Sequence, residues 1–387
     1  MNKMKDSSND TVKQQEIADH LGISRTTVSR CFTNHAGVSP VTRAKVFDFA
    51  SKMGYQHMEA RTPKPGRVAM TRRVGVLICT ELEEFARPDY ESPGVKLYVG
   101  LSEFAQLNHI KLELRYVDPK EKALDSPSYQ NLKGIHDREW DGMILIYPFP
   151  RAVVDEIDIA FPMVSLVEQY GTADFNCVDV NHFKGIAMMM NKLVALGHEQ
   201  IGFYTKPYEV EAQWSMRRFS AFVEKSIRLG FSIREENFVN VQPSRYISLE
   251  ESFRYVRKRI KAGVTAWVCA ADHQAYDLIA ALQKEGIRVP QDVSITGFDG
   301  IDKPRGAPLL TTIIIPYREI GFTGGRRLLE LMKKRFGSAQ RILIAPQVRE
   351  GETVGPVPKR HYESNGDGIG KSKKPAASLD GKAKHRR

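Results

Sequence analysis

The chain has 387 residues, a hydrophobic share of 42% and a formal net charge of +11, which allow two or three domains with substantial cores. No apolar run reaches the roughly 18 residues of a membrane span, and no apolar stretch of a secretion signal follows the opening "MNKMKDSSND". The four cysteines are far apart in the sequence, so we expect buried thiols in a reducing cytoplasm and neither disulfides nor a metal site. We also expect no cofactor.

Residues 1–55 predict a helix-turn-helix domain made of three helices. Apolar residues recur at helical spacing from Gln14, and Gly22 ends the first helix. Ser24 can cap a second helix, 25–32, because its hydroxyl can accept a hydrogen bond from a backbone N–H of the first turn. Ser39 can cap a third helix within "VSPVTRAKVFDFASKMGY". Two short helices joined by the "LGIS" turn, with a third that closes the core, are typical of this domain.

The second helix carries short polar and cationic side chains on its outer face. Its apolar residues Val28, Cys31 and Phe32 face the first helix, and the outward residues are Arg25, Thr26, Ser29 and Arg30. Such side chains suit DNA base edges and phosphates, although an exposed polar face is also typical of a helix that contacts only solvent.

The segment "IADHLGISRTTVSRCF…VSPVTRAKVFDFASKMGY" resembles the DNA-binding domain of the lactose-repressor/galactose-repressor family, with "TVSR" and "TR" intact. The resemblance implies that Arg25 and Thr26 set operator preference and that Ser29 and Arg30 contact bases. It also implies phosphate contacts by Ser24, Thr27, Ser39 and Thr42. Thr33 stands where the family usually has Asn.

Residues 56–73, "QHMEARTPKPGRVAMTRR", predict a basic linker because Pro63, Pro65 and Gly66 disfavour a stable helix. The family has a short hinge helix here, whose leucine inserts into the minor groove, but Pro63 occupies the leucine position. We expect basic side chains to contact the DNA backbone instead, from Arg61, Lys64, Arg67, Arg72 and Arg73.

Residues 74–350 predict two α/β lobes with parallel sheets and helices on both faces. Short apolar strands such as "RRVGVLIC", "IKLELRYV" and "VSITGFD" alternate with helical patterns such as "GVKLYVGLSEFAQLN" and "HQAYDLIAALQKEGI". There are too many strands for one sheet. In such folds ligands bind at the carboxyl ends of the strands.

The resemblance to the same family continues through "LVALGHEQIGFY", "GIRVPQDVSITGFDG" and "PLLTTIIIPYREIG", and it implies a periplasmic-binding-protein-like domain that dimerises and binds a small effector. Arg218 stands at the family's effector-binding arginine, and Asp299 at the acid that binds ligand hydroxyls. Asp272 remains from the family's Asn-Asp pair, since Ala271 replaces the Asn. Tyr246 and Tyr317 are candidates for stacking on a ligand ring or for core packing.

Residues 351–387 predict a basic, disordered tail. Residues 356–387 contain 9 Lys or Arg against 3 Asp or Glu, and residues 1–73 contain 13 against 6, so the charge lies at the two ends of the chain. This distribution favours a polyanionic partner. "NGDGIGKS", residues 365–372, imitates a phosphate-binding loop but lacks its first glycine and a preceding strand.

The sequence therefore predicts a transcriptional regulator, most simply a repressor, that binds a near-palindromic double-stranded DNA operator as a homodimer. Its effector is expected to be a carbohydrate, and no catalytic constellation or membrane partner is expected. Three alternatives stay open. One is a regulator that binds no ligand. Two features would fit this alternative: the replaced Asn, and "ESPG" (91–94), which stands where the family often has two aromatic residues in the pocket. The others are a sugar-binding transport protein and a sugar-modifying α/β enzyme.

Overall fold

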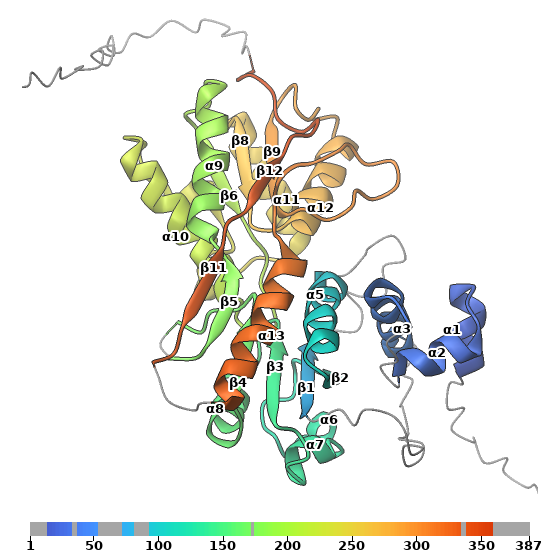
Figure 1. The fold of residues 1–387 in the computed structure, drawn as a ribbon. Coiled ribbons are helices and arrows are strands. Elements are labelled where there is room, and N and C mark those ends of the chain that lie inside the picture. The colour runs from blue at the N-terminus through green and yellow to red at the C-terminus, as the bar shows by residue number, and fades with distance from the viewer. Residues whose placement is uncertain are drawn as a thin grey trace, which may run out of the picture.

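The structure is a computed structural model that describes residues 14–32, 37–52, 72–80, 93–171, 174–333 and 338–358. A small helical head lies beside a larger body of two lobes, each built on a six-stranded sheet (Figure 1). The predicted division into an all-α head and a two-lobed α/β body is confirmed.

The head contains the three predicted helices, α1 (Gln14–Leu21), α2 (Arg25–Phe32) and α3 (Pro40–Lys52). Both predicted caps form, since Ser24 Oγ accepts from Thr27 N and Ser39 Oγ accepts from Thr42 N, each at 3.0 Å. The small core consists of seven buried residues: Ile17, Ala18, Val28, Cys31, Val38, Val46 and Ala50.

The first lobe holds a parallel sheet in the order β11-β5-β4-β3-β1-β2. Its strands are β1 (Arg72–Cys79), β2 (Ile110–Val117), β3 (Gly142–Ile146), β4 (Met163–Leu166), β5 (Cys177–Val180) and β11 (Arg341–Ile344). Its helices are α5 (Pro93–Leu107), α6 (Pro127–Gln130), α7 (Lys133–His136), α8 (Arg151–Ala160) and α13 (Tyr317–Lys333).

The second lobe holds a sheet in the order β12-β10-β9-β8-β6-β7, parallel except for β12 against β10. Its strands are β6 (Ile201–Tyr204), β7 (Phe238–Val239), β8 (Ala266–Cys269), β9 (Ser294–Asp299), β10 (Thr311–Ile314) and β12 (Gln347–Arg349). Its helices are α9 (His182–Ala195), α10 (Gln213–Arg228), α11 (Leu249–Lys261) and α12 (Asp272–Lys284), with short 3-10 turns at Glu235–Asn237 and Pro243–Arg245.

The chain crosses between the lobes three times, between β5 and α9, between β10 and α13, and between β11 and β12 (Figure 1). Because a strand of each lobe leads directly into the other lobe, the carboxyl ends of the two parallel sheets meet at the crossovers. This arrangement places a candidate ligand site between the lobes.

Two domain boundaries differ from the prediction. The body begins at Arg72, two residues earlier than expected, because Arg72 and Arg73 belong to β1. It also extends beyond residue 350: Thr353 is fully buried and bonds Ile295 O at 2.7 Å, and Val357 N bonds Leu196 O. Residues 351–358 are therefore part of the second lobe and not of a disordered tail. The rest of the predicted linker and tail lies outside the described residues.

Arg73, which the sequence predicts to contact the DNA backbone, is bound to carboxylates of its own lobe. Its Nε bonds Glu113 Oε1 and its Nη1 bonds Glu139 Oε2, both at 2.8 Å. Glu113, on β2, also accepts from Trp140 Nε1 at 3.0 Å. Burial alone would raise the pKa of Glu113, but these hydrogen bonds and Lys111 outweigh burial and lower it to about 2.

We predict a pH-dependent contribution of Glu113 to stability. Because its folded pKa is depressed, the stabilisation is present above the unfolded pKa near 4.5 and is lost as the pH falls towards 2. Glu113→Gln should lower the free energy of unfolding by about 2–3 kcal/mol at pH 7. The loss should shrink in urea titrations repeated at pH 3. An equal loss at both pH values would show that packing, and not charge, is what Gln disturbs.

Candidate DNA-binding surface and ligand cavity

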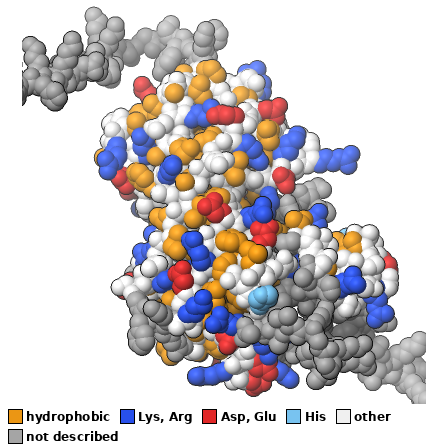
Figure 2. All heavy atoms as spheres, viewed as in Figure 1, with side chains coloured by type: hydrophobic (Ala, Val, Ile, Leu, Met, Phe, Trp, Pro, Cys, Tyr) orange, Lys and Arg blue, Asp and Glu red, His pale blue; other side chains and the backbone are white. Residues whose placement is uncertain are grey.

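The predicted base-reading residues lie together on the outer face of α2. Arg25, Thr26 and Arg30 are exposed and Ser29 is half-buried, whereas Val28 and Cys31 are buried against the head core. Figure 2 shows Lys and Arg side chains on the outer side of the head, away from the lobes. The face is thus open to a long polyanion such as DNA.

The predicted phosphate contacts are paired hydroxyls at the starts of α2 and α3. Ser24 Oγ lies 2.9 Å from Thr27 Oγ1, and Ser39 Oγ lies 2.8 Å from Thr42 Oγ1. Ser24 and Ser39 are exposed, while Thr27 and Thr42 are half-buried. A helix N-terminus with free N–H groups and hydroxyls favours a phosphate.

Between the lobes lies a cavity of about 170 Å³. It is bordered by residues that lie one or two positions beyond parallel strands: Thr80 after β1, Tyr147 after β3, Val167 after β4 and Ala271 after β8. The remaining lining residues are Cys79, Pro93, Pro119, Pro148, Tyr208, Glu209, Val210, Ala212, Trp214, Arg218, His273, Asp299, Ile315 and Tyr317. The cavity thus occupies the position that the sequence predicts for a ligand site.

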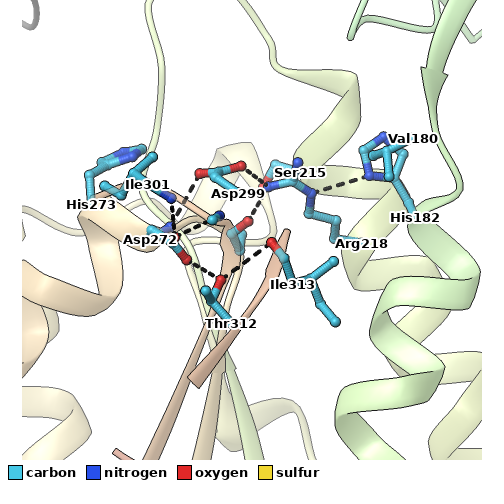
Figure 3. A network of polar contacts seen from close by, with 12 residues as sticks. Val180, His182, Ser215, Arg218, Asp272, His273, Asp299, Ile301, Thr312 and Ile313 are labelled. Carbon is cyan, nitrogen blue, oxygen red and sulfur yellow. Dashed lines mark hydrogen bonds and ion pairs between the residues drawn. The ribbon is translucent and has the colours of Figure 1, made fainter. Parts of the chain in front are cut away.

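Arg218, on α10, is the most heavily bonded group of the cavity. Its side chain is 4% exposed, and its Nη1 donates to Ala270 O and, at 3.2 Å, to Asp299 Oδ1 (Figure 3). The guanidinium carbon lies 4.5 Å from the ring centre of Trp214 and 3.9 Å from that of Phe298. Burial between two rings therefore fixes the plane of the guanidinium.

His182 and Asp179 hold Arg218 from the opposite side, and sequence reasoning missed both. Arg218 Nε donates to His182 Nδ1 at 3.2 Å, so His182 Nε2 carries the proton that Asp179 Oδ2 accepts at 2.9 Å. Burial lowers the pKa of His182 more than Asp179 raises it, so the ring stays neutral. Asp179 is the last residue but one of β5 and His182 begins α9, so this chain of hydrogen bonds lies at a crossover between the lobes.

Asp299 lies in the cavity, whereas Asp272 lies beneath it. Asp299 Oδ2 accepts from Asp272 N at 3.2 Å, and its Oδ1 lies 3.4 Å from Tyr317 Oη. Asp272 is fully buried, and its carboxylate accepts from Gly300 N at 2.8 Å, Ile301 N at 2.9 Å and the Thr312 hydroxyl. Burial and the nearby Asp299 carboxylate raise the pKa of Asp272. Asp272 organises the loop after β9 and does not line the cavity.

The two candidate tyrosines differ in position. Tyr317 lines the cavity and is 7% exposed. Tyr246 is 40% exposed on a surface loop and does not line the cavity, so the structure removes it from the candidate site. The aromatic walls come from Tyr147, Tyr208 and Trp214, which sequence reasoning missed because they lie in loops or before a motif.

Three residues that line the cavity have positive φ although none is glycine: Tyr147 (73°), Val167 (57°) and Asp299 (154°). This backbone region is unfavourable for side chains with a β-carbon, and most of all for β-branched valine. Such strain persists where the surrounding structure enforces it, and it concentrates at binding sites. The backbone of the cavity is therefore held in a specific shape.

Comparisons with known proteins agree with this geometry. Residues 14–57 match the model of bacterial regulatory proteins of the lacI family, and residues 190–354 match a periplasmic binding protein-like domain. The chain is 26% identical over 366 residues to the HTH-type transcriptional regulator IpsA of Corynebacterium glutamicum, with 88% of this chain and 97% of the relative covered. It is also 26% identical to the HTH-type transcriptional repressor PurR of Yersinia pestis, with 90% and 98% covered.

Two solved structures share the fold over most of the chain. A transcriptional regulator CelR–cellobiose complex gives a TM-score of 0.61 at 20% identity, covering 88% of this chain and 99% of that chain. A lac repressor dimer bound to operator and the anti-inducer ONPF gives 0.58 at 21% identity, covering 89% and 100%. The head therefore matches the lacI family of bacterial regulatory proteins and the body matches a periplasmic binding protein-like domain, and the chain is a DNA-binding transcriptional regulator.

Within the described residues, no helix is long and apolar enough to cross a membrane. The same residues contain no group of three or more His, Cys, Asp or Glu side chains that could hold a metal ion.

Proposed function

We propose that the protein is a repressor that binds an inverted-repeat operator as a homodimer in the cytoplasm and responds to an uncharged, hydroxylated ring compound in the interlobe cavity. The DNA-binding part of this proposal rests on the exposed side chains of Arg25, Thr26 and Arg30 on α2. Ser24 caps α2 and Ser39 caps α3. The reading helix is fixed by the head core, so its outer side chains enter the major groove together.

Arg30→Ala should weaken binding to the cognate operator by about 1–3 kcal/mol and binding to random DNA much less, because a base contact discriminates between sequences. The operator is first recovered by selection from a random duplex library. Competition gel shifts then compare the two DNAs at fixed salt. Equal losses on both would assign Arg30 to a phosphate.

The charges of the cavity support an uncharged effector. Among its lining residues in the described ranges, the formally charged side chains are Glu209, Arg218 and Asp299, which sum to −1 with His273 neutral. Arg218 is already paired with Asp299, so a phosphate or carboxylate would have to compete with that acid. Arginine and carboxylate groups together suit ligand hydroxyls, which both donate and accept.

The aromatic walls support a ring-shaped ligand. Tyr147 lies on one lobe and Tyr208 and Trp214 on the other, and Pro93, Pro119 and Pro148 complete an apolar surround. Flat side chains with a few polar groups are typical of sites that fix one face of a ring. The strained backbone at Tyr147, Val167 and Asp299 supports the same assignment.

The effector half is tested with matched neutral and anionic compounds: glucose and glucose 6-phosphate, myo-inositol and its monophosphate, adenosine and AMP. Trp214 is the reporter, because Trp140 and Trp267 are 4% and 0% exposed and lie outside the cavity. We expect a neutral compound to change Trp214 fluorescence and operator affinity. If the phosphorylated compound of a pair binds more tightly than its neutral counterpart, the proposal of an uncharged effector is contradicted. No response to any compound favours a regulator that binds no ligand.

A further inference from the structure

Arg43, on α3 of the head, is inserted into a contact with the first lobe. It is completely buried, and its Nη1 donates to Ser102 Oγ on α5 at 2.9 Å. Gln106 lies one turn further along α5, and its amide oxygen, when turned towards the guanidinium, lies 2.6 Å from Nη1. Tyr98, one turn before Ser102, is buried as well. In Figure 1, α3 lies directly beside α5.

This contact is specific because a buried guanidinium requires acceptors at defined positions. Each buried donor that loses its acceptor costs free energy, and groups that bear charge cost most. Tyr98, Ser102 and Gln106 are spaced by four residues and therefore form one stripe on α5. The stripe holds the head in one orientation, with Arg25, Thr26 and Arg30 still exposed.

The opposite face of α5 packs closely on α13. Gly100 lies against Arg318 O, and Gly321 lies against Leu97 O, so closely that a β-carbon at either glycine would overlap the carbonyl. Arg318 on α13 also bonds Glu103 on α5 at 2.8 Å. The two helices therefore move together, since packed cores transmit displacement and do not absorb it.

Both helices begin at the ligand cavity. Pro93 starts α5 and Tyr317 starts α13, and both line the cavity. Ser102 lies nine residues beyond Pro93, which is about 14 Å along a helix that rises 1.5 Å per residue. One rigid pair of helices thus connects the cavity to the site where Arg43 docks.

We infer that Arg43 is a positioning residue that fixes the head on α5, and that the α5–α13 pair carries a change at the cavity to the reading helix. The regulatory half of this inference rests on the proposed effector function. The contact provides a path from ligand to DNA through α3 and α5, both within the described residues, and does not require a hinge helix in the linker.

Docking is tested first, by amide hydrogen exchange of α3 in the full-length protein. Ser102→Ala removes one of the two acceptors on α5 without changing the head itself, and we expect α3 to exchange about tenfold faster. Arg43→Met should do the same. Arg25→Met is the matched control, because it removes an exposed arginine on α2, and α3 exchange should stay as in the wild type. Unchanged exchange in both Ser102→Ala and Arg43→Met overturns the docking.

Coupling is tested next, with whichever compound of the panel above binds. In the wild type it should change operator affinity. In Ser102→Ala it should bind within about twofold of the wild type by Trp214 fluorescence, while its effect on operator affinity is lost. If the compound changes the operator affinity of Ser102→Ala as much as that of the wild type, the coupling does not depend on the contact between Arg43 and Ser102. If no compound binds, the proposed effector function and the coupling both fail, whereas the exchange experiment still decides the docking.

Discussion

Asp272→Ala is expected to lower the free energy of unfolding by about 3–5 kcal/mol, the largest effect on stability that we predict. The carboxylate is fully buried and accepts from Gly300 N, Ile301 N and the Thr312 hydroxyl. Alanine leaves the two backbone N–H groups without a partner and the Thr312 hydroxyl with only a 3.4 Å hydrogen bond to Ile313 O, in a site that is too enclosed for full hydration. The loop that carries Asp299 into the cavity loses its support at the same time.

Urea unfolding of the full-length protein measures the Asp272→Ala effect. Asp272→Asn keeps one acceptor oxygen and should lose about half as much. Asp302→Ala is the control, because that side chain is 70% exposed and should change stability by less than about 0.5 kcal/mol. A loss at Asp272 no larger than at Asp302 would show that the three donors have other partners.

Arg218→Met is expected to weaken effector binding by at least about 100-fold, because it removes the only cation of the described cavity lining. It should also lower stability by about 2–4 kcal/mol, since Asp299 is left buried without its positive partner. Binding is measured by calorimetry with the compound found in the screen, and stability is measured by urea unfolding.

A double variant separates these two effects of Arg218. Arg218→Met with Asp299→Asn removes both charges, so stability should return towards the wild type while ligand binding stays weak. Arg228→Met on the same helix is the control, because that side chain is 68% exposed and distant from the cavity lining. Normal ligand affinity in Arg218→Met would remove Arg218 from the effector site.

The head was predictable almost to the residue because its signals are local. Gly22 adopts a φ of 63° at the turn, and Ser24 and Ser39 cap the helices that follow them. Each of these features depends on a few neighbouring residues, which the sequence displays directly. Strand candidates such as "RRVGVLIC" were equally clear, because a strand buried on both faces is almost wholly apolar.

The cavity was only partly predictable, because it is assembled from distant loops. Arg218, Asp299 and Tyr317 were found through motifs, but Tyr208 and Trp214 belong to no pattern in the sequence. The chain of hydrogen bonds from Asp179 through His182 to Arg218 depends on the crossover after β5, which periodicity does not reveal. Arg43 belongs to the "TR" motif, but its contact with Ser102 spans 59 residues and appears only in the structure.

The sequence predicts a tail over residues 351–358 because half of these residues are glycine or proline. Their burial comes from single groups that fit the second lobe. His198 bonds Gly355 O at 3.0 Å, and Thr353 completes the hydrogen bonds of β9 and β10. The composition of residues 351–358 does not reveal these individual contacts. It therefore predicts disorder for residues that the structure packs against the second lobe.

The central claim is that α2 reads a specific DNA sequence for a dimeric regulator. The most direct measurement is nuclease footprinting of the full-length protein on genomic fragments at moderate salt, with Arg30→Ala in parallel. The account predicts protection of a single inverted repeat by the wild type and loss of that protection in Arg30→Ala at the same concentration. Uniform protection of all fragments, or identical footprints for both proteins, would contradict it.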